Sequence, residues 1–181
     1  MNQQSPVPDE RELKLTEALR TALDHAFFEA KTELEEDGCV TPFSILATSD
    51  GYVVTDHPGE DVDAIYDSVA MLLARELPEA YTFTYDGYIE LDDGRHEAVI
   101  CELAHRGDEL ASILALPYEV TQDGPAFWDD PIFAGPAEPL YPAGTQPIVS
   151  GAVKLAAQRA SEQAAPGTAT ANEPEDSMKE A

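Results

Sequence analysis

The sequence predicts an α+β domain at residues 9–120, with the element order helix-β-β-helix-β-β-β. Two segments carry an apolar residue every three or four positions, which is the period of an amphipathic helix. Five other segments are rich in β-branched and aromatic residues. The connections between neighbouring strands are short, and short connections imply antiparallel pairing. We therefore expect a five-stranded antiparallel sheet that carries two helices.

The first helix is expected from residue 8 to about residue 36. Asp9 and Glu12 have the spacing of a capping box, which predicts the start of the helix there. Asp37 and Gly38 are typical of its end. Its apolar positions form one stripe, with charged residues on the other face: Leu15, Leu19, Ala22, Leu23, Ala26, Phe27, Ala30 and Leu34.

A hairpin is expected next, because two β-rich runs, 41–48 and 52–55, flank Asp50-Gly51. Glycine accepts the positive φ that tight turns require. The second helix follows, with acids in its first turn and Pro78 at its end. Its apolar stripe consists of Val62, Ile65, Tyr66, Val69, Leu72 and Leu73.

The rest of the domain predicts a three-strand meander. From Tyr81 to Tyr85 aromatic residues alternate with threonine, as one buried and one wetter face require. Asp86-Gly87 falls within this strand, and we interpret it as a bulge. The turns are expected at 92–94 and 106–108, with an apolar central strand at 98–104 between them.

The composition changes after residue 120. Residues 121–150 contain six prolines, and this density excludes a helix or a central strand, so we expect a Pro/aromatic-rich extended segment. Phe127, Trp128 and Phe133 lie among acids there, and aromatic anchors of this kind are typical of a partner-binding segment. The alternative is that Trp128 and Phe133 fold back and cover an apolar patch of the domain.

The two ends of the chain differ from the domain in composition. Residues 165–181 consist mainly of Pro, Gly, Thr, Ala and Glu, which predicts a disordered tail. Residues 1–8 are likewise expected to be disordered. Residues 151–164 predict one short last helix.

Acidic residues outnumber basic ones by a wide margin. The chain has 36 Asp and Glu residues and 10 Lys and Arg residues, which gives a net charge of −26. Residues 1–120 hold 27 of the acids and 7 of the bases, so the charge belongs mainly to the domain. A surplus of this sign opposes binding to nucleic acid and to anionic membranes, and it favours a basic partner.

No motif in the sequence predicts a cofactor or a metal. There is no glycine-rich phosphate loop, and the four histidines lack the spacing of metal ligands. No apolar run approaches the ~20 residues of a membrane span, and the start does not resemble a secretory signal. Cys39 and Cys101 are expected to be buried and reduced. We therefore expect a soluble cytoplasmic protein.

No residue is assigned a catalytic role, but Glu102 is a polar candidate, because it interrupts an apolar strand. A buried carboxylate must be paired, hydrogen-bonded or protonated. Arg95 or Arg106 could reach it from a strand end, which would make a structural ion pair. Together with His96, these arginines are also the polar candidates for a small hydrolase or transferase site.

The element order resembles that of the roadblock and profilin-like α/β adaptors, including an Asp-Gly turn at Asp50-Gly51. A second resemblance, to small bacterial proteins of unknown function, is carried by Asp86-Gly87, Asp92 to Arg95, Glu102, Arg106-Gly107 and Pro117-Tyr118. Shared topology does not fix function, so neither resemblance implies an activity or a site residue.

Three interpretations remain open at this point. The first is a non-enzymatic interaction domain that binds a basic protein, as an immunity-type inhibitor of a basic toxin or a nucleic-acid mimic does. The second is a hydrolase or transferase centred on Glu102. The third is an acidic surface that reflects adaptation to high salt only. The sequence also leaves open whether the chain forms a homodimer, and whether residues 121–150 pack in cis or exchange between subunits.

Overall fold

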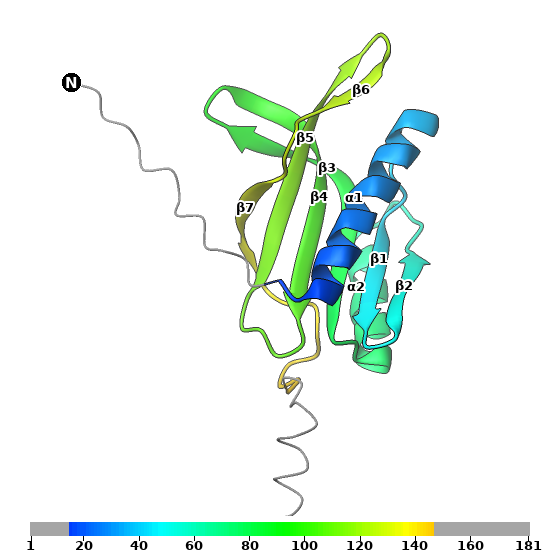
Figure 1. Ribbon diagram of the computed structural model, residues 1–181, viewed down its shortest axis with the longest axis vertical. Coiled ribbons are helices and arrows are strands. Elements are labelled where there is room, and N and C mark those ends of the chain that lie inside the picture. The colour runs from blue at the N-terminus through cyan, green and yellow to red at the C-terminus, as the bar shows by residue number, and fades with distance from the viewer. Residues whose placement is uncertain (1–14, 147–181) are drawn as a thin grey trace, which may run out of the picture. The chain divides into compact units, whose positions relative to one another are not determined.

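The computed structural model describes residues 15–146, and Figure 1 shows their arrangement. The helix predicted at 151–164 and the segments 1–8 and 165–181 lie outside the described residues. The described elements are α1 (Glu17–Glu36), β1 (Phe43–Thr48), β2 (Gly51–Asp56), α2 (Val62–Glu76), β3 (Ala80–Leu91), β4 (Gly94–His105), β5 (Ala111–Thr121), β6 (Gly124–Phe127) and β7 (Ile132–Ala137).

All of these strands belong to one antiparallel sheet, in the order β2-β1-β3-β4-β5-β6. β7 pairs with the first half of β5, and β6 pairs with its second half. The α+β class, the two helices and the antiparallel pairing are therefore confirmed, whereas the expected count of five strands is wrong. The two additional strands come from the proline-rich segment, because proline is tolerated at the edge of a sheet.

α1 covers one face of the sheet. Its buried side packs against residues of β1, β3, β4 and β5, among them Ile45, Val99 and Leu114. Small side chains let the helix lie close to the strands, and three positions of its stripe are alanines without solvent exposure: Ala22, Ala26 and Ala30.

The start of α1 differs from the prediction. The helix begins at Glu17, and residues 15 and 16 precede it in non-helical conformation. Thr16 is the N-cap, and its hydroxyl accepts a hydrogen bond from the N–H of Leu19 at 3.3 Å. The helix expected from residue 8 is therefore too long at its N-terminal end, because Thr16 caps it later in the chain.

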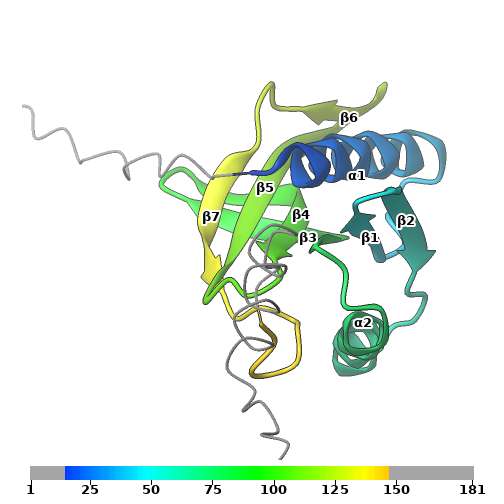
Figure 2. The same cartoon turned by 60° about the horizontal axis from the view of Figure 1, so that its bottom comes forward.

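α2 packs on the opposite face, and Figure 2 shows the two helices on either side of the sheet. Its N-cap is Asp61, whose carboxylate accepts hydrogen bonds from the first turn. Its end is set by Leu77, which adopts the left-handed conformation immediately before Pro78. The buried side of α2 packs on Leu46 of β1 and on Tyr81 and Phe83 of β3.

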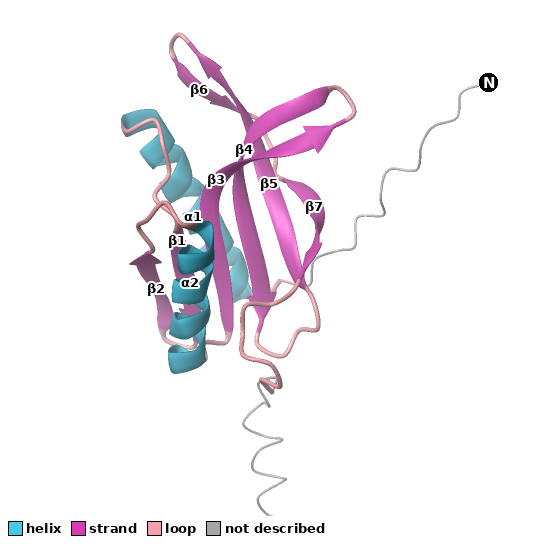
Figure 3. Cartoon of the chain, turned by 180° about the vertical axis from the view of Figure 1, so that it is seen from behind, coloured by secondary structure: helices cyan, strands magenta, loops and turns pink. Residues whose placement is uncertain are grey.

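β3 and β4 form one long hairpin of two 12-residue strands. Their register runs without a shift, so the bulge expected at Asp86-Gly87 is wrong. Gly87 leaves little room for a side chain, since a Cβ there would lie 3.1 Å from Cγ1 of Ile100, closer than most Cβ contacts. Figure 3 shows that the distal half of this hairpin projects beyond the part of the sheet that the helices cover.

Candidate protein-interaction surface

β2 is an open edge of the sheet. It pairs with β1 alone among the described strands, from Phe43↔Asp56 to Thr48↔Gly51. The predicted hairpin is confirmed, with Ser49 and Asp50 at the turn. Gly51 has a φ of +136°, which L side chains rarely adopt, so glycine is required where the strand leaves the turn.

The backbone of β2 points outward at every second residue. The N–H of His57 donates to the carbonyl of Pro42 at 2.7 Å, so these two residues form a hydrogen-bonded pair. Hydrogen-bonded pairs alternate with non-bonded pairs in an antiparallel ladder, which places Val53 and Thr55 in bonds to β1. The residues between them turn their N–H and C=O groups to the open side: Tyr52, Val54 and Asp56.

The side chains along this edge are apolar and exposed. Tyr52 is 44% exposed, Val53 57% and Val54 42%. Tyr52 lies against His25 of α1, with the ring centroids 4.9 Å apart. We call Tyr52, Val53 and Val54 the apolar edge.

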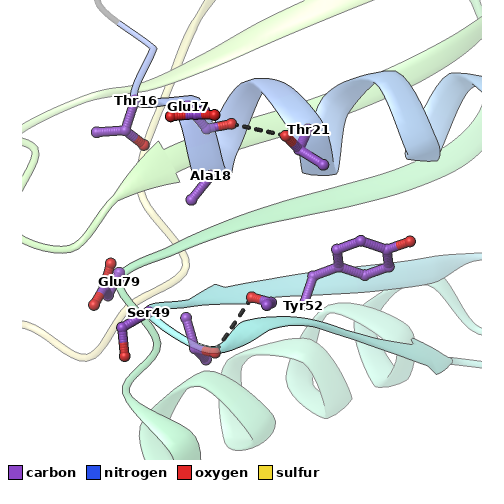
Figure 4. Close-up of a pocket in the computed structure, with 9 residues that line it drawn as sticks. Thr16, Glu17, Ala18, Thr21, Ser49, Tyr52 and Glu79 are labelled. Carbon is purple, nitrogen blue, oxygen red and sulfur yellow. Dashed lines mark hydrogen bonds between the residues drawn. The ribbon is translucent and has the colours of Figure 1, made fainter.

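A groove of about 440 Å³ lies between the first turn of α1 and the start of β2. Figure 4 shows Ala18 pointing from the helix into the gap and Glu79 at one end of it. Seven of its nine lining residues carry a hydroxyl or a carboxylate: Thr16, Glu17, Ala18, Thr21, Thr48, Ser49, Gly51, Tyr52 and Glu79 line the groove. The groove therefore offers polar contacts beside the apolar edge.

Carboxylates surround the apolar edge. Asp50 and Asp56 lie at the two ends of β2, and Glu29 lies 3.4 Å from His25. The others line the groove or a smaller cavity of about 180 Å³ that follows β2. We call this set the acidic rim: Glu17, Glu29, Asp50, Asp56, Glu60, Asp61 and Glu79.

The basic residues lie mostly elsewhere. Residues 15–146 contain 28 acids and five bases, a net charge of −23. Four of these bases contact other parts of the molecule: Lys31 lies over Phe127, Arg75 pairs with Glu76, Arg95 lies over Tyr88, and Arg106 donates to the carbonyl of Leu77. The fifth base, Arg20, lies in α1, so we expect the seven carboxylates of the acidic rim to make the potential at β2 negative.

Glu102 lies in the interior between α2 and the sheet. Its residue is 5% exposed, and the hydroxyls of Tyr66 and Tyr85 both donate to its Oε1, the second at 2.9 Å. Burial, and then the hydrogen bond to Glu102, raise the pKa of Tyr66 to about 12, so its hydroxyl remains a donor. The sequence placed Tyr66 in the apolar stripe of α2 and gave no sign of this polar contact.

The two arginines expected near Glu102 do not reach it. Arg95 lies over the ring of Tyr88, 3.5 Å from its centroid, and Arg106 donates to a backbone carbonyl at 2.9 Å. The expected ion pair is therefore wrong for the described residues, because two tyrosines satisfy the carboxylate. Glu102 also lines none of the four best-formed cavities among these residues.

The aromatic residues of the proline-rich segment lie in three different environments. Phe127 packs against Tyr118 and the core beneath α1, with the ring centroids 5.5 Å apart. Trp128 lies against His96, 5.7 Å between centroids, and keeps 38% of its surface exposed. Phe133 in β7 is half exposed. Within this chain β6 and β7 pair with β5, so the segment extends the sheet.

The two cysteines differ from each other. Both are free, but Cys39 is exposed, contrary to the expectation, and Cys101 is buried. Burial raises the pKa of the Cys101 thiol to about 12. A thiol that stays protonated is a poor nucleophile, so Cys101 is a packing residue beneath α1.

His57 is a buried residue that sequence reasoning did not single out. Its imidazole lies between two hydroxyls, 2.8 Å from Oγ of Ser44 and 2.9 Å from Oγ of Ser68. Burial lowers its pKa, and the nearby Asp56 opposes this effect. Because His57 directly follows β2, these contacts fasten the end of that strand to β1 and α2.

Within residues 15–146 no group of three or more His, Cys, Asp or Glu side chains is arranged to hold a metal ion. No helix in this range is long and apolar enough to cross a membrane. No family model, curated protein or solved structure matches the chain.

Proposed function

We propose that this chain is an acidic protein-interaction domain that binds a basic protein partner through β2 and the apolar edge. One observation carries the proposal: an unpaired strand presents exposed apolar side chains inside a rim of carboxylates. An immunity-type inhibitor of a basic toxin and a nucleic-acid mimic are specific forms of this function.

The exposure of β2 supports a binding role. An open strand presents a row of free N–H and C=O groups, and proteins commonly protect such an edge with charges, prolines or bulges. Between Gly51 and Thr55 this strand carries none of the three. Exposed apolar side chains gathered on one edge are typical of a surface that another protein covers.

The charge supports a basic partner. A carboxylate rim attracts Lys and Arg side chains, speeds their encounter with the edge and repels acidic proteins. The same repulsion acts between two copies of this chain, each with a net charge of −23 over the described residues. A basic protein therefore fits the edge better than a second copy does.

The hydrolase or transferase interpretation has less support. It requires Glu102 and basic groups to converge in a concave site. The Glu102 carboxylate is instead held by Tyr66 and Tyr85, and neither Arg95 nor Arg106 faces it in the described residues.

Affinity capture from native lysate tests the proposal, with three forms of the full chain as bait. The wild type is compared with Val53→Glu at β2 and with Phe133→Glu at β7, which are exposed to similar extents. We expect the wild type to retain a stoichiometric protein rich in Lys and Arg. Val53→Glu should lose at least about 90% of it, since a carboxylate then replaces a contact, and Phe133→Glu should retain it.

Salt provides the second arm of this experiment. Recovery should fall as KCl rises from about 50 mM to about 500 mM, because the Debye length shortens over this range. An acidic partner, or equal losses in both variants, would contradict the proposal. Failure to capture any stoichiometric partner, together with a melting temperature that climbs with KCl, would favour salt adaptation instead.

A further inference from the structure

We infer that the partner binds by strand addition, with an extended basic segment extending the sheet antiparallel to the outer edge of β2. The inference rests on the proposed function and specifies how the partner is recognised. The inference is based on three features of β2. N–H and C=O groups point away from β1, apolar side chains lie on both faces of the strand, and the carboxylate of Asp56 lies at a fixed position in the register.

The backbone of β2 has free N–H and C=O groups on its open side, and a further strand could pair with them. Tyr52, Val54 and Asp56 present their N–H and C=O groups to the open side, and the register with β1 has no shift. The strand is fixed at both ends, by the Ser49-Asp50 turn and by the contacts of His57 with Ser44 and Ser68. A pre-ordered edge lowers the entropic cost of adding a strand.

The side chains of β2 define what the added strand must carry. Side chains on paired strands share a face when their residues are directly opposite. Residues opposite Tyr52 and Val54 therefore lie on the side of α1, near His25, and the residue opposite Val53 lies on the other side. All of these contacts are apolar, which favours three consecutive apolar residues in the segment.

Asp56 fixes the place of a basic residue. It lies two residues after Val54, and in an antiparallel pair its opposite residue precedes the one opposite Val54 by two. An opposite charge there makes a favourable cross-strand pair. The expected motif is therefore a Lys or Arg, any residue, and then three apolar residues; parallel addition would place the basic residue after the apolar run.

The carboxylates of the groove at α1 predict a second basic residue in the added strand. Beyond Gly51 an added strand passes the turn at Asp50 and the end of the groove lined by Glu17 and Glu79 (Figure 4). A second Lys or Arg shortly after the apolar run would lie among these carboxylates. We therefore expect basic residues on both sides of the run.

The test is a selection of linear peptides from a displayed random library on the full chain. The most enriched peptide is then synthesised and its Kd is measured for the wild type, Val54→Pro and Val54→Thr. Val54→Pro removes an outward N–H without removing a bond to β1, and Val54→Thr keeps that N–H and the branched shape. We expect at least about fivefold weaker binding for the proline variant and less than about twofold change for threonine.

Amide exchange on the unmodified chain gives a second readout that does not depend on any variant. The amides of Tyr52, Val54 and Asp56 should exchange several-fold more slowly when the peptide is bound. Enriched peptides with the expected motif, the Val54→Pro loss and this protection together support strand addition.

Three results would overturn the inference, and they separate it from the proposed function. Basic peptides that bind Val54→Pro as well as the wild type, but lose Val53→Glu, would reject strand addition and leave the basic-partner proposal standing. Acidic peptides, or no enrichment over an unrelated protein, would reject both. A stable dimer of the chain that Val54→Pro dissociates would show that a second copy occupies the edge.

Discussion

The two edges of the sheet are built differently. β2 is six residues long, contains no proline and pairs with β1 in regular register. The opposite edge is divided between a four-residue and a six-residue strand, with Pro125 in β6, Pro136 in β7 and a register shift at Ile113/Leu114 of β5. Prolines and irregular pairing prevent an edge from pairing with another chain. The molecule thus protects one edge and leaves the other open, and this difference supports the proposal that the open edge serves binding.

The largest effect is expected from proline placed at two successive positions of β2. Val53→Pro removes a hydrogen bond to β1 and leaves a carbonyl of that strand without its donor, so it should lower the free energy of unfolding by about 2–3 kcal/mol. Val54→Pro removes only an outward N–H and should cost less than about 1 kcal/mol. Urea denaturation measures both, and equal losses would contradict the assigned ladder.

A smaller effect is expected where β2 is fastened to the rest of the domain. His57→Ala removes the partner of Ser44, a residue without solvent exposure, and should lower the free energy of unfolding by about 1–3 kcal/mol. His57→Gln retains a hydrogen-bonding side chain and should lose less. Identical stabilities of the two variants would show that the imidazole hydrogen bonds do not hold this end of the edge.

His57 also makes the free energy of unfolding depend on pH. Burial lowers the His57 pKa below its ordinary value of 6.5, so the folded chain binds this proton less readily than the unfolded chain does. The contribution of His57 to stability is therefore complete above about pH 6.5 and declines as the pH falls below it. Denaturation at several pH values should show the gap between the wild type and His57→Gln narrowing in acid. A constant gap would contradict the direction of the shift.

The smallest effect is expected at the protected edge. Lys31 lies over the ring of Phe127, 5.4 Å from its centroid, beside β6. Lys31→Ala should lower the free energy of unfolding by about 0.5–1 kcal/mol, and Lys31→Arg should retain most of it. Neither variant should change partner capture, because the Lys31 ammonium lies over Phe127 of β6, at the edge of the sheet opposite β2. Loss of capture in Lys31→Ala would mean that the partner uses the β6 side.

Much of the fold follows from local patterns. The stripes that include Leu19 and Val69 predicted both helices, and the Asp50-Gly51 turn predicted the first hairpin. β6 and β7 could not be predicted in the same way, because Pro125 and Pro136 give these edge strands the composition of an extended loop. The start of α1 was also wrong, since Asp9 and Glu12 have the spacing of a capping box but the N-cap is Thr16, whose hydroxyl accepts from the N–H of Leu19.

Local sequence patterns predicted little of the candidate site. The run Tyr52-Val53-Val54 has the composition of any strand, and it becomes an edge only because β1 pairs with β3 on its other side. The contact between Tyr66 and Glu102 joins residues 36 positions apart, and the apolar run at 98–104 predicted only that Glu102 interrupts an apolar strand. The negative charge was visible at once, but its gathering around β2 depends on the fold.

Site-specific photo-crosslinking compares the two edges most directly. A photoreactive phenylalanine analogue is placed at Val53 in β2 or at Phe133 in β7, and the full chain is irradiated in native lysate. We predict that the Val53 position captures a basic protein in good yield and that the Phe133 position does not. Capture of the same protein at Phe133 alone, or with equal yield at both positions, would contradict the assignment of β2 as the binding edge.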